Sequence, residues 1–136
     1  GTLVLVTWQA VARNEWFRTI ADAVSDRQPF AAPPPDAPGP FSLSEPARVR
    51  QLLGAAGFAD VELDDVREPM YFGADADDAY AFICSLGFTK WKLSQLDAAG
   101  RARALDTLRQ AIAAHDSSDG VLFESAVWIT SARNGA

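Results

Sequence analysis

Few side chains in this sequence are of the kinds that do acid–base or nucleophilic chemistry. His115 is its only histidine and Cys84 its only cysteine. A histidine titrates near neutral pH and could act as a general base, while a thiolate could act as a nucleophile. His115 comes at the end of an expected helix, where an imidazolium favours the helix dipole, and Cys84 follows Ile83 on a helix face. We therefore expect a structural histidine and a buried, inert cysteine.

Carboxylates are the other candidates, because they are ligands for hard cations. Asp75, Asp77 and Asp78 fall within one helical turn and have no partner histidine nearby. Capping and solvation explain this cluster better than a metal does, so we predict no metal site. The acidic run at 62–65 is expected to form the solvated side of a strand.

The elements that would position these side chains alternate between strands and helices. The pattern predicts strands over 2–8, 61–66 and 121–132, and helices over 15–25, 45–56, 75–86 and 97–115. The first strand is apolar on both faces, as is typical of a strand covered on both sides. The last strand has apolar residues on both parities, so we expect it to lie inside the sheet, between the other two.

Residues 38–66 carry the most detailed local pattern. Ser44 is a natural N-cap, and Pro46 suits the first helical turn. One apolar helix face is expected to pack on a sheet, and it comprises Val49, Leu52, Leu53 and Ala56. Gly57 should stop the helix in the left-handed conformation, and the chain should leave the sheet again at 68–73.

A proline-rich loop interrupts the pattern. Residues 28–40 contain six of the eight prolines, which predicts a semi-rigid, extended segment. This segment has few apolar residues to bury, so we expect it to be the most mobile internal part of the chain.

Length and composition limit the classes of protein. The 136 residues support a single domain, and an apolar content of 49% supports a real core. A net charge of −6 disfavours binding of nucleic acid through phosphates. No apolar run reaches membrane-spanning length and no signal peptide is recognisable, so we expect no membrane partner. The single cysteine fits a reducing compartment, and a cytoplasmic location is expected.

The order of these elements, with Pro-Gly-Pro-Phe at 38–41 and Ala-Gly-Phe at 56–58, carries a resemblance. The chain resembles the C-terminal half of class I S-adenosylmethionine (SAM)-dependent methyltransferases, especially the small-molecule branch related to quinone-biosynthesis enzymes. The resemblance implies a partial Rossmann-like α/β fold of about three strands and four helices, with an antiparallel, central last strand. Residues 9–40 would form a lid helix and a proline-rich loop inserted within the domain 1–136.

The resemblance also implies a set of site residues. In this family the loops after the later strands form the pocket for the methyl acceptor, and methyl transfer mainly needs alignment and exclusion of water. Carried over to this chain, the acceptor-binding residues are Trp8, Asn14, Trp16, Phe17 and Phe41. Since these are mostly aromatic and carry little charge, a small, largely apolar acceptor is expected. The alternative is that the aromatic side chains only pack the lid helix.

The Gly-rich turn that binds SAM in this family has no counterpart here. Gly54 and Gly57 lie in and at the end of an expected helix, so they cannot cradle a cofactor. The sequence also begins inside a strand. We therefore expect the C-terminal portion of a longer enzyme or a truncated relative, with SAM bound by the complete enzyme and not by this chain alone.

Two other functions stay open. The first is a non-catalytic interaction module that kept this fold and pairs with itself or with another chain. The second is an unrelated α+β ligand-binding domain, which fits less well because its helices need not fall in this order. In the methyltransferase family the strand matching Leu3 to Val6 has a neighbour on each side, and here one neighbour is missing. We expect this edge to mediate a homodimer, or pairing with a missing N-terminal half.

Overall fold

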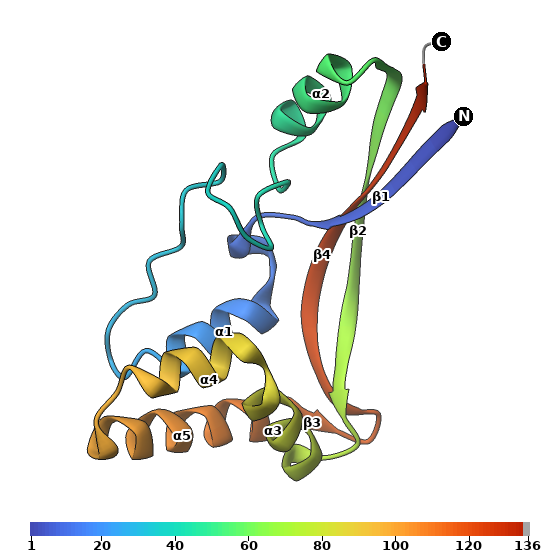
Figure 1. Cartoon of the computed structure of the whole chain (residues 1–136). Helices are drawn as coiled ribbons and strands as arrows, with labels where there is room; N and C mark the ends of the chain where they lie inside the picture. The colour runs from blue at the N-terminus through green and yellow to red at the C-terminus, as the bar shows by residue number, and fades with distance from the viewer. Residues whose placement is uncertain (135–136) are drawn as a thin grey trace. The chain divides into compact units, whose positions relative to one another are not determined.

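The computed structural model describes residues 1–134 and shows a mixed α/β chain (Figure 1). The strands are β1 (Thr2–Trp8), β2 (Phe58–Gly73), β3 (Asp116–Ser117) and β4 (Gly120–Asn134). A 3-10 helix (Val11–Arg13) precedes the α-helices, which are α1 (Glu15–Ala23), α2 (Pro46–Ala55), α3 (Ala76–Ser85), α4 (Gly87–Ser94) and α5 (Ala98–Ala113). Over these residues there are four strands and five α-helices, one more of each than the sequence predicts.

The strands form one antiparallel sheet in the order β1-β4-β2, and β3 pairs with the start of β4. β4 runs antiparallel to β1, with Leu3 opposite Ala132 and Trp8 opposite Val127. The prediction that the last strand is antiparallel and lies between the two earlier long strands is confirmed. Its apolar residues on both parities suit a strand whose two faces are both covered, and such strands commonly lie inside a sheet.

The chain divides into two compact units. The first comprises Gly1–Asn14, Ala32–Glu68 and the chain from Ser125 onward, and the second comprises Glu15–Ala31 and Pro69–Glu124. Both β2 and β4 contribute residues to each unit.

In the first unit, β1 has one covered and one open face. On the covered face, Thr130 and Ala132 of β4 are each 1% exposed. On the other face, Val4 is 60% and Val6 is 67% exposed. The expectation that β1 is covered on both faces is therefore wrong. Apolar residues at both parities indicate a strand, but they do not show whether one or both of its faces are covered.

The helix α2 begins one residue later than predicted. Its N-cap is Glu45, with Pro46 in the first turn, where the missing N–H costs no hydrogen bond. Ser44 is buried and its carbonyl accepts a hydrogen bond of 2.8 Å from Nε1 of Trp128, so the expectation that Ser44 caps α2 is wrong. Gly57 has a φ of +85°, which confirms the left-handed stop.

The apolar face expected on α2 is only partly covered. Val49 is buried, whereas Leu52 is exposed. β2 also departs from the prediction, because it continues through residues 68–73 instead of leaving the sheet at 66. Pro69 is tolerated there because β2 is a terminal strand in the order β1-β4-β2, and an edge strand can place a missing N–H outward.

The second unit contains a hydrophobic core built by α1, α3, α4, α5 and the adjoining ends of β2 and β4. The core residues of α1 and α5 include Ile20, Leu108 and Ile112, and Phe72 and Phe123 belong to the same core, with their ring centroids 5.2 Å apart. Two helices start as predicted: Asp75 accepts from the N–H of Asp78, and Asp97 accepts from that of Gly100. No helix of residues 1–134 is long and apolar enough to cross a membrane.

Helix α4 was not predicted from the sequence. Gly87, which was expected only to end the preceding helix, is the first residue of α4. Phe82, expected on the buried face of α3, is 48% exposed. The buried residues of α3 are Ala79 and Ile83, so its buried face is narrower than the spacing of its apolar residues suggests.

Candidate functional site

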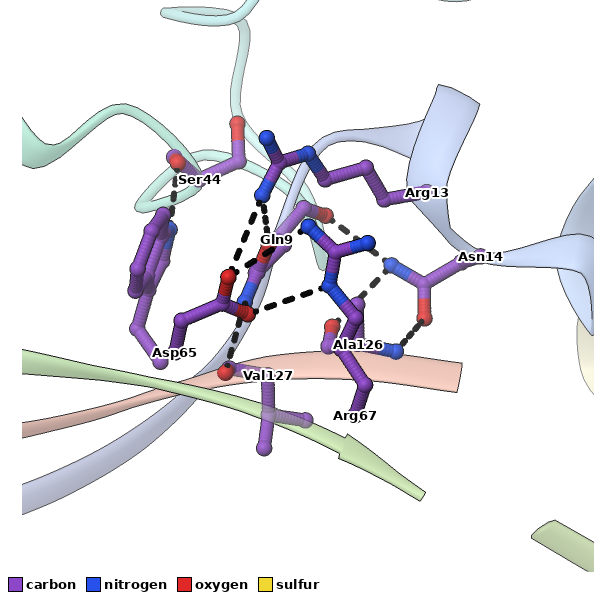
Figure 2. A network of polar contacts seen from close by, with 9 residues as sticks. Gln9, Arg13, Asn14, Ser44, Asp65, Arg67, Ala126 and Val127 are labelled. Atoms are coloured by element: carbon purple, nitrogen blue, oxygen red, sulfur yellow. Dashed lines mark hydrogen bonds and ion pairs between the residues drawn. The ribbon is translucent and has the colours of Figure 1, made fainter. Parts of the chain in front are cut away.

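A network of polar side chains lies where β1 ends, within the first unit (Figure 2). The backbone N–H of Gln9 donates to the carbonyl of Ala126 at 2.9 Å, which continues the pairing of β1 with β4 by one residue. The chain then turns through the 3-10 helix Val11–Arg13 to Asn14. Gln9 and Asn14 are each 0% exposed, so their amide groups must find partners inside the protein.

The side-chain amide of Asn14 pairs with the backbone of β4 at Ala126, as a peptide group of a neighbouring strand would. Its Oδ1 accepts from the N–H of Ala126 at 2.9 Å, and its Nδ2 lies 3.2 Å from the carbonyl of Ala126. The same Nδ2 also donates to the carbonyl of Gln9 at 3.1 Å. An amide presents the same donor and acceptor pair as a peptide group, so Asn14 ties the turn to the strand in the way a neighbouring strand would.

Gln9 connects the turn to β2. Its Nε2 donates to Oδ1 of Asp65 at 2.6 Å and to the carbonyl of Val127 at 2.9 Å. Its Oε1 accepts from Nη1 of Arg13 at 2.8 Å. The side-chain amide of Gln9 therefore has a partner for each of its polar atoms, which fixes its orientation (Figure 2).

Asp65 forms ion pairs with two arginines, Arg13 and Arg67. Nη2 of Arg67 lies 3.3 Å from its Oδ2, and Nη1 of Arg13 lies 3.7 Å from the same oxygen. The hydrogen bond from Gln9, followed by that from Arg67, lowers the pKa of Asp65 below its ordinary value. Asp65 is therefore ionised at neutral pH, and the network holds two positive charges and one negative charge.

The sequence did not predict that Gln9, Arg13, Asp65 and Arg67 belong to one site. Asp65 was assigned to the solvated side of a strand, although its carboxylate accepts from the buried amide of Gln9. One local signal was available: a polar amide follows directly after seven residues of apolar strand. Such a side chain at a strand end must be either solvated or paired.

The residues predicted to bind the acceptor divide between the two units. Trp8, Asn14 and Phe41 belong to the first unit, and Phe41 is buried there. Trp16 and Phe17 belong to the second unit, where their ring centroids are 5.5 Å apart.

Trp16 and Phe17 both pack against aromatic neighbours of the second unit. The ring centroid of Trp16 lies 6.1 Å from that of Phe72, and the ring centroid of Phe17 lies 4.9 Å from that of Phe88. These contacts favour the alternative that the pair packs the lid helix, since such distances are typical of aromatic pairs in cores.

His115 has an acceptor at each ring nitrogen. Nδ1 lies 2.8 Å from the carbonyl of Ala111 and Nε2 lies 3.1 Å from Oε1 of Glu15, while the ring stacks on Phe123 at 4.1 Å. Neither nitrogen is open to a substrate, which supports the structural role predicted from the sequence. Cys84 is partly exposed, so the expectation that it is buried is wrong.

Two of the carboxylates considered as metal ligands, those of Asp75 and Asp78, accept hydrogen bonds from nearby backbone N–H groups. Asp75 caps α3, and Oδ2 of Asp78 accepts from the N–H of Ala74 at 2.9 Å. Within the described part of the chain, no group of three or more His, Cys, Asp or Glu side chains could hold a metal ion.

Comparison with known proteins adds no assignment. Neither models of protein families nor curated protein sequences match this chain. The network offers guanidinium donors, a fixed amide and the carboxylate of Asp65, whose lowered pKa makes it a weak base. Such groups are suited to binding and orienting a ligand.

Proposed function

We propose that the chain is the C-terminal portion of a SAM-dependent methyltransferase that acts on a small, largely apolar acceptor. The observation that carries the proposal is the sheet order β1-β4-β2, with the last strand antiparallel and between the two earlier ones. This arrangement is the one expected for the end of a partial Rossmann-like methyltransferase fold. The helix α2 directly before β2, joined to it through Gly57, supports the same assignment.

In the proposed enzyme the missing N-terminal half supplies the SAM-binding loop, and this chain supplies acceptor contacts. Of the residues that the resemblance assigns to the acceptor, Trp8 and Phe41 of the first unit remain the proposed contacts. Asn14 is wholly buried with its amide bonded to Gln9 and Ala126, and Trp16 and Phe17 pack against aromatic neighbours of the second unit. Methyl transfer from a sulfonium is a displacement that needs alignment and a dry site more than an acid or a base. A chain whose only histidine is held by two protein acceptors is compatible with such a reaction.

The test compares this chain with the product of its complete reading frame. We expect the coding DNA upstream of Gly1 to encode a strand followed by Asp-x-Gly-x-Gly-x-Gly. In calorimetric titrations with SAM, the complete protein should bind in the micromolar range. Residues 1–136 alone should bind very weakly, because within residues 1–134 no strand leads into a Gly-rich turn. Micromolar binding of SAM by the pure chain 1–136 would contradict the proposal.

A second candidate function is a non-catalytic module that pairs with itself or with another chain. The observation that favours it is the position of β1 at the end of the sheet order, with Val4 and Val6 exposed. An apolar edge strand is a template for pairing with another strand. A reading frame that starts close to Gly1, together with a stable dimer in solution, would favour this candidate over the methyltransferase.

A further inference from the structure

Two guanidinium groups in the first unit share a single carboxylate. Arg13 ends the 3-10 helix and Arg67 follows Asp65 by two residues on β2, so both reach the same side of that strand (Figure 2). Arg13 and Arg67 carry two positive charges, and Asp65 neutralises only one of them. Among these three side chains, one positive charge is left unbalanced, in a chain of net charge −6.

Neither arginine is held tightly by Asp65. The contacts of Asp65 with Arg67 measure 3.3 and 3.4 Å, and its contact with Arg13 measures 3.7 Å. Charge-assisted hydrogen bonds of this type usually measure about 2.7–2.9 Å. The short bond to Asp65 comes instead from the neutral amide of Gln9, at 2.6 Å. The guanidinium groups therefore retain hydrogen-bonding capacity that Asp65 does not use.

The unused donors face solvent. The side chains of Arg13 and Arg67 are 47% and 58% exposed. Arg13 makes its contacts with Gln9 and Asp65 through Nη1 alone, and Arg67 makes its contacts through Nε and Nη2. Each guanidinium thus keeps at least one nitrogen that can donate to an incoming anion.

The base of this pair is rigid. Gln9 and Asn14 are both wholly buried. Oε1 of Gln9 accepts from Nη1 of Arg13 at 2.8 Å, which fixes one end of that guanidinium group. Groups whose orientation is fixed before binding lose less conformational entropy when a ligand arrives. Arg13, which is bonded to a buried amide, is therefore better suited to binding than a free surface arginine. Arg67 is positioned less directly, through Asp65, whose carboxylate is itself bonded to Gln9.

We propose that Arg13 and Arg67 bind the carboxylate group of a small-molecule ligand, in competition with Asp65. A carboxylate is favoured because the same two guanidinium groups already accommodate one, and because their excess of one positive charge matches a monoanion. Inorganic phosphate carries more than one negative charge at neutral pH, which exceeds the single positive charge that Asp65 leaves unbalanced on this pair. The inference concerns binding alone and does not rest on methyl transfer.

The experiment is an NMR titration of the complete 136-residue chain that follows the arginine Nε–Hε signals. Benzoate is the probe, benzamide is its neutral counterpart of similar shape, and inorganic phosphate is the competing anion. We expect saturable shifts of Arg13 and Arg67 with benzoate that weaken as sodium chloride is added, and no such shifts with benzamide. Equal shifts with benzoate and benzamide, or tighter binding of phosphate than of benzoate, would overturn the proposal.

Two variants and a control test the assignment to these side chains. Arg13→Gln and Arg67→Gln should each weaken benzoate binding about tenfold, as expected for loss of one charge-assisted hydrogen bond. Arg50→Gln is the matched control, because Arg50 is exposed on α2 and outside the network. The affinity of Arg50→Gln for benzoate should equal that of the unchanged chain.

Asp65→Asn separates binding from a purely structural role. Removal of the competing carboxylate should tighten benzoate binding several-fold, whereas a network that only supports the fold would show no gain. Unchanged binding in Arg13→Gln and Arg67→Gln, or no tightening in Asp65→Asn with a native-like amide spectrum, would contradict the proposal.

Discussion

Asp26 and Arg103 form a bidentate ion pair in the second unit. Nε and Nη2 of Arg103 lie 2.9 and 2.7 Å from the two carboxylate oxygens of Asp26, which ties the turn after α1 to α5. The hydrogen bond from Arg103 lowers the pKa of Asp26 below its ordinary value. This carboxylate stays ionised to lower pH in the folded chain than in the unfolded chain, so the pair links stability to pH.

We predict that Asp26→Asn destabilises the chain at neutral pH and loses that effect in acid. The pair stabilises the folded state fully above about pH 4, where an unfolded aspartate is ionised. Its contribution falls as the pH drops through the lowered pKa of folded Asp26. Urea unfolding between pH 7 and pH 2 would measure the difference from the unchanged chain. Asp36→Asn, in the exposed proline-rich loop, is the control, and a difference independent of pH would count against the prediction.

The N-cap of α3 gives a second prediction for a single residue. Oδ1 of Asp75 accepts from the N–H of Asp78 at 2.9 Å, so Asp75→Ala leaves that donor without its cap. We expect a loss of about 1 kcal/mol in the free energy of unfolding. Asp77→Ala changes a carboxylate in the same turn that is not the cap, and it should cost clearly less. Equal losses for the two variants would show that charge, rather than capping, is what matters.

At the scale of the elements, the segment at 28–40 has no helix or strand. Its local contacts include a turn in which the N–H of Ala37 donates to the carbonyl of Pro34 at 2.9 Å. The ring of Phe30 packs against Phe17 and Phe88, but the rest of the segment is mostly exposed and opens at little cost in free energy. In contrast, α5 buries Ala104, Leu108 and Ile112.

We therefore predict that thermolysin cuts first within 28–40 and that amide hydrogens there exchange faster than those of 101–112. Mass spectrometry of the first fragments and of deuterium uptake would measure both. Earlier cleavage or faster exchange within 101–112 would mean that α5 is not part of the stable core, contrary to the burial of its apolar residues.

At the scale of the whole molecule, the open question is what covers β1. β1 pairs with β4 alone in the sheet order, and Val4 and Val6 are exposed. The residues from Leu3 to Val6 include no lysine, proline or inward charge that would discourage pairing with another strand. Exposed apolar strands of this kind usually belong to an interface.

We predict that the isolated chain self-associates, most simply as a two-fold dimer through β1. Light scattering coupled to size exclusion at micromolar concentration should give the mass of a dimer, and Val4→Lys should shift it toward the monomer. Leu52→Lys is the matched control, because Leu52 is also an exposed apolar residue of the first unit but lies on α2. A monomer in all three proteins would contradict the prediction.

The sequence by itself determined those features that depend on near neighbours in the chain. The cap at Asp75, the stop at Gly57 and the start of α5 near Asp97 follow from local hydrogen bonding and from the 3.6-residue period. The central place of β4 was also predicted, from apolar residues on both parities. β1 has the same pattern and lies at the end of the sheet order, so the pattern alone does not fix a strand's place in the sheet.

Only the tertiary structure decided the open face of β1, the continuation of β2 and the polar network. Gln9 meets Asp65 across 56 residues, and Asn14 meets Ala126 across 112 residues. No local period records such pairs, because they depend on the register in which distant strands align. For the same reason Asp65 looked like a solvated strand residue in the sequence: the buried amide that lowers its pKa is supplied by another strand's end.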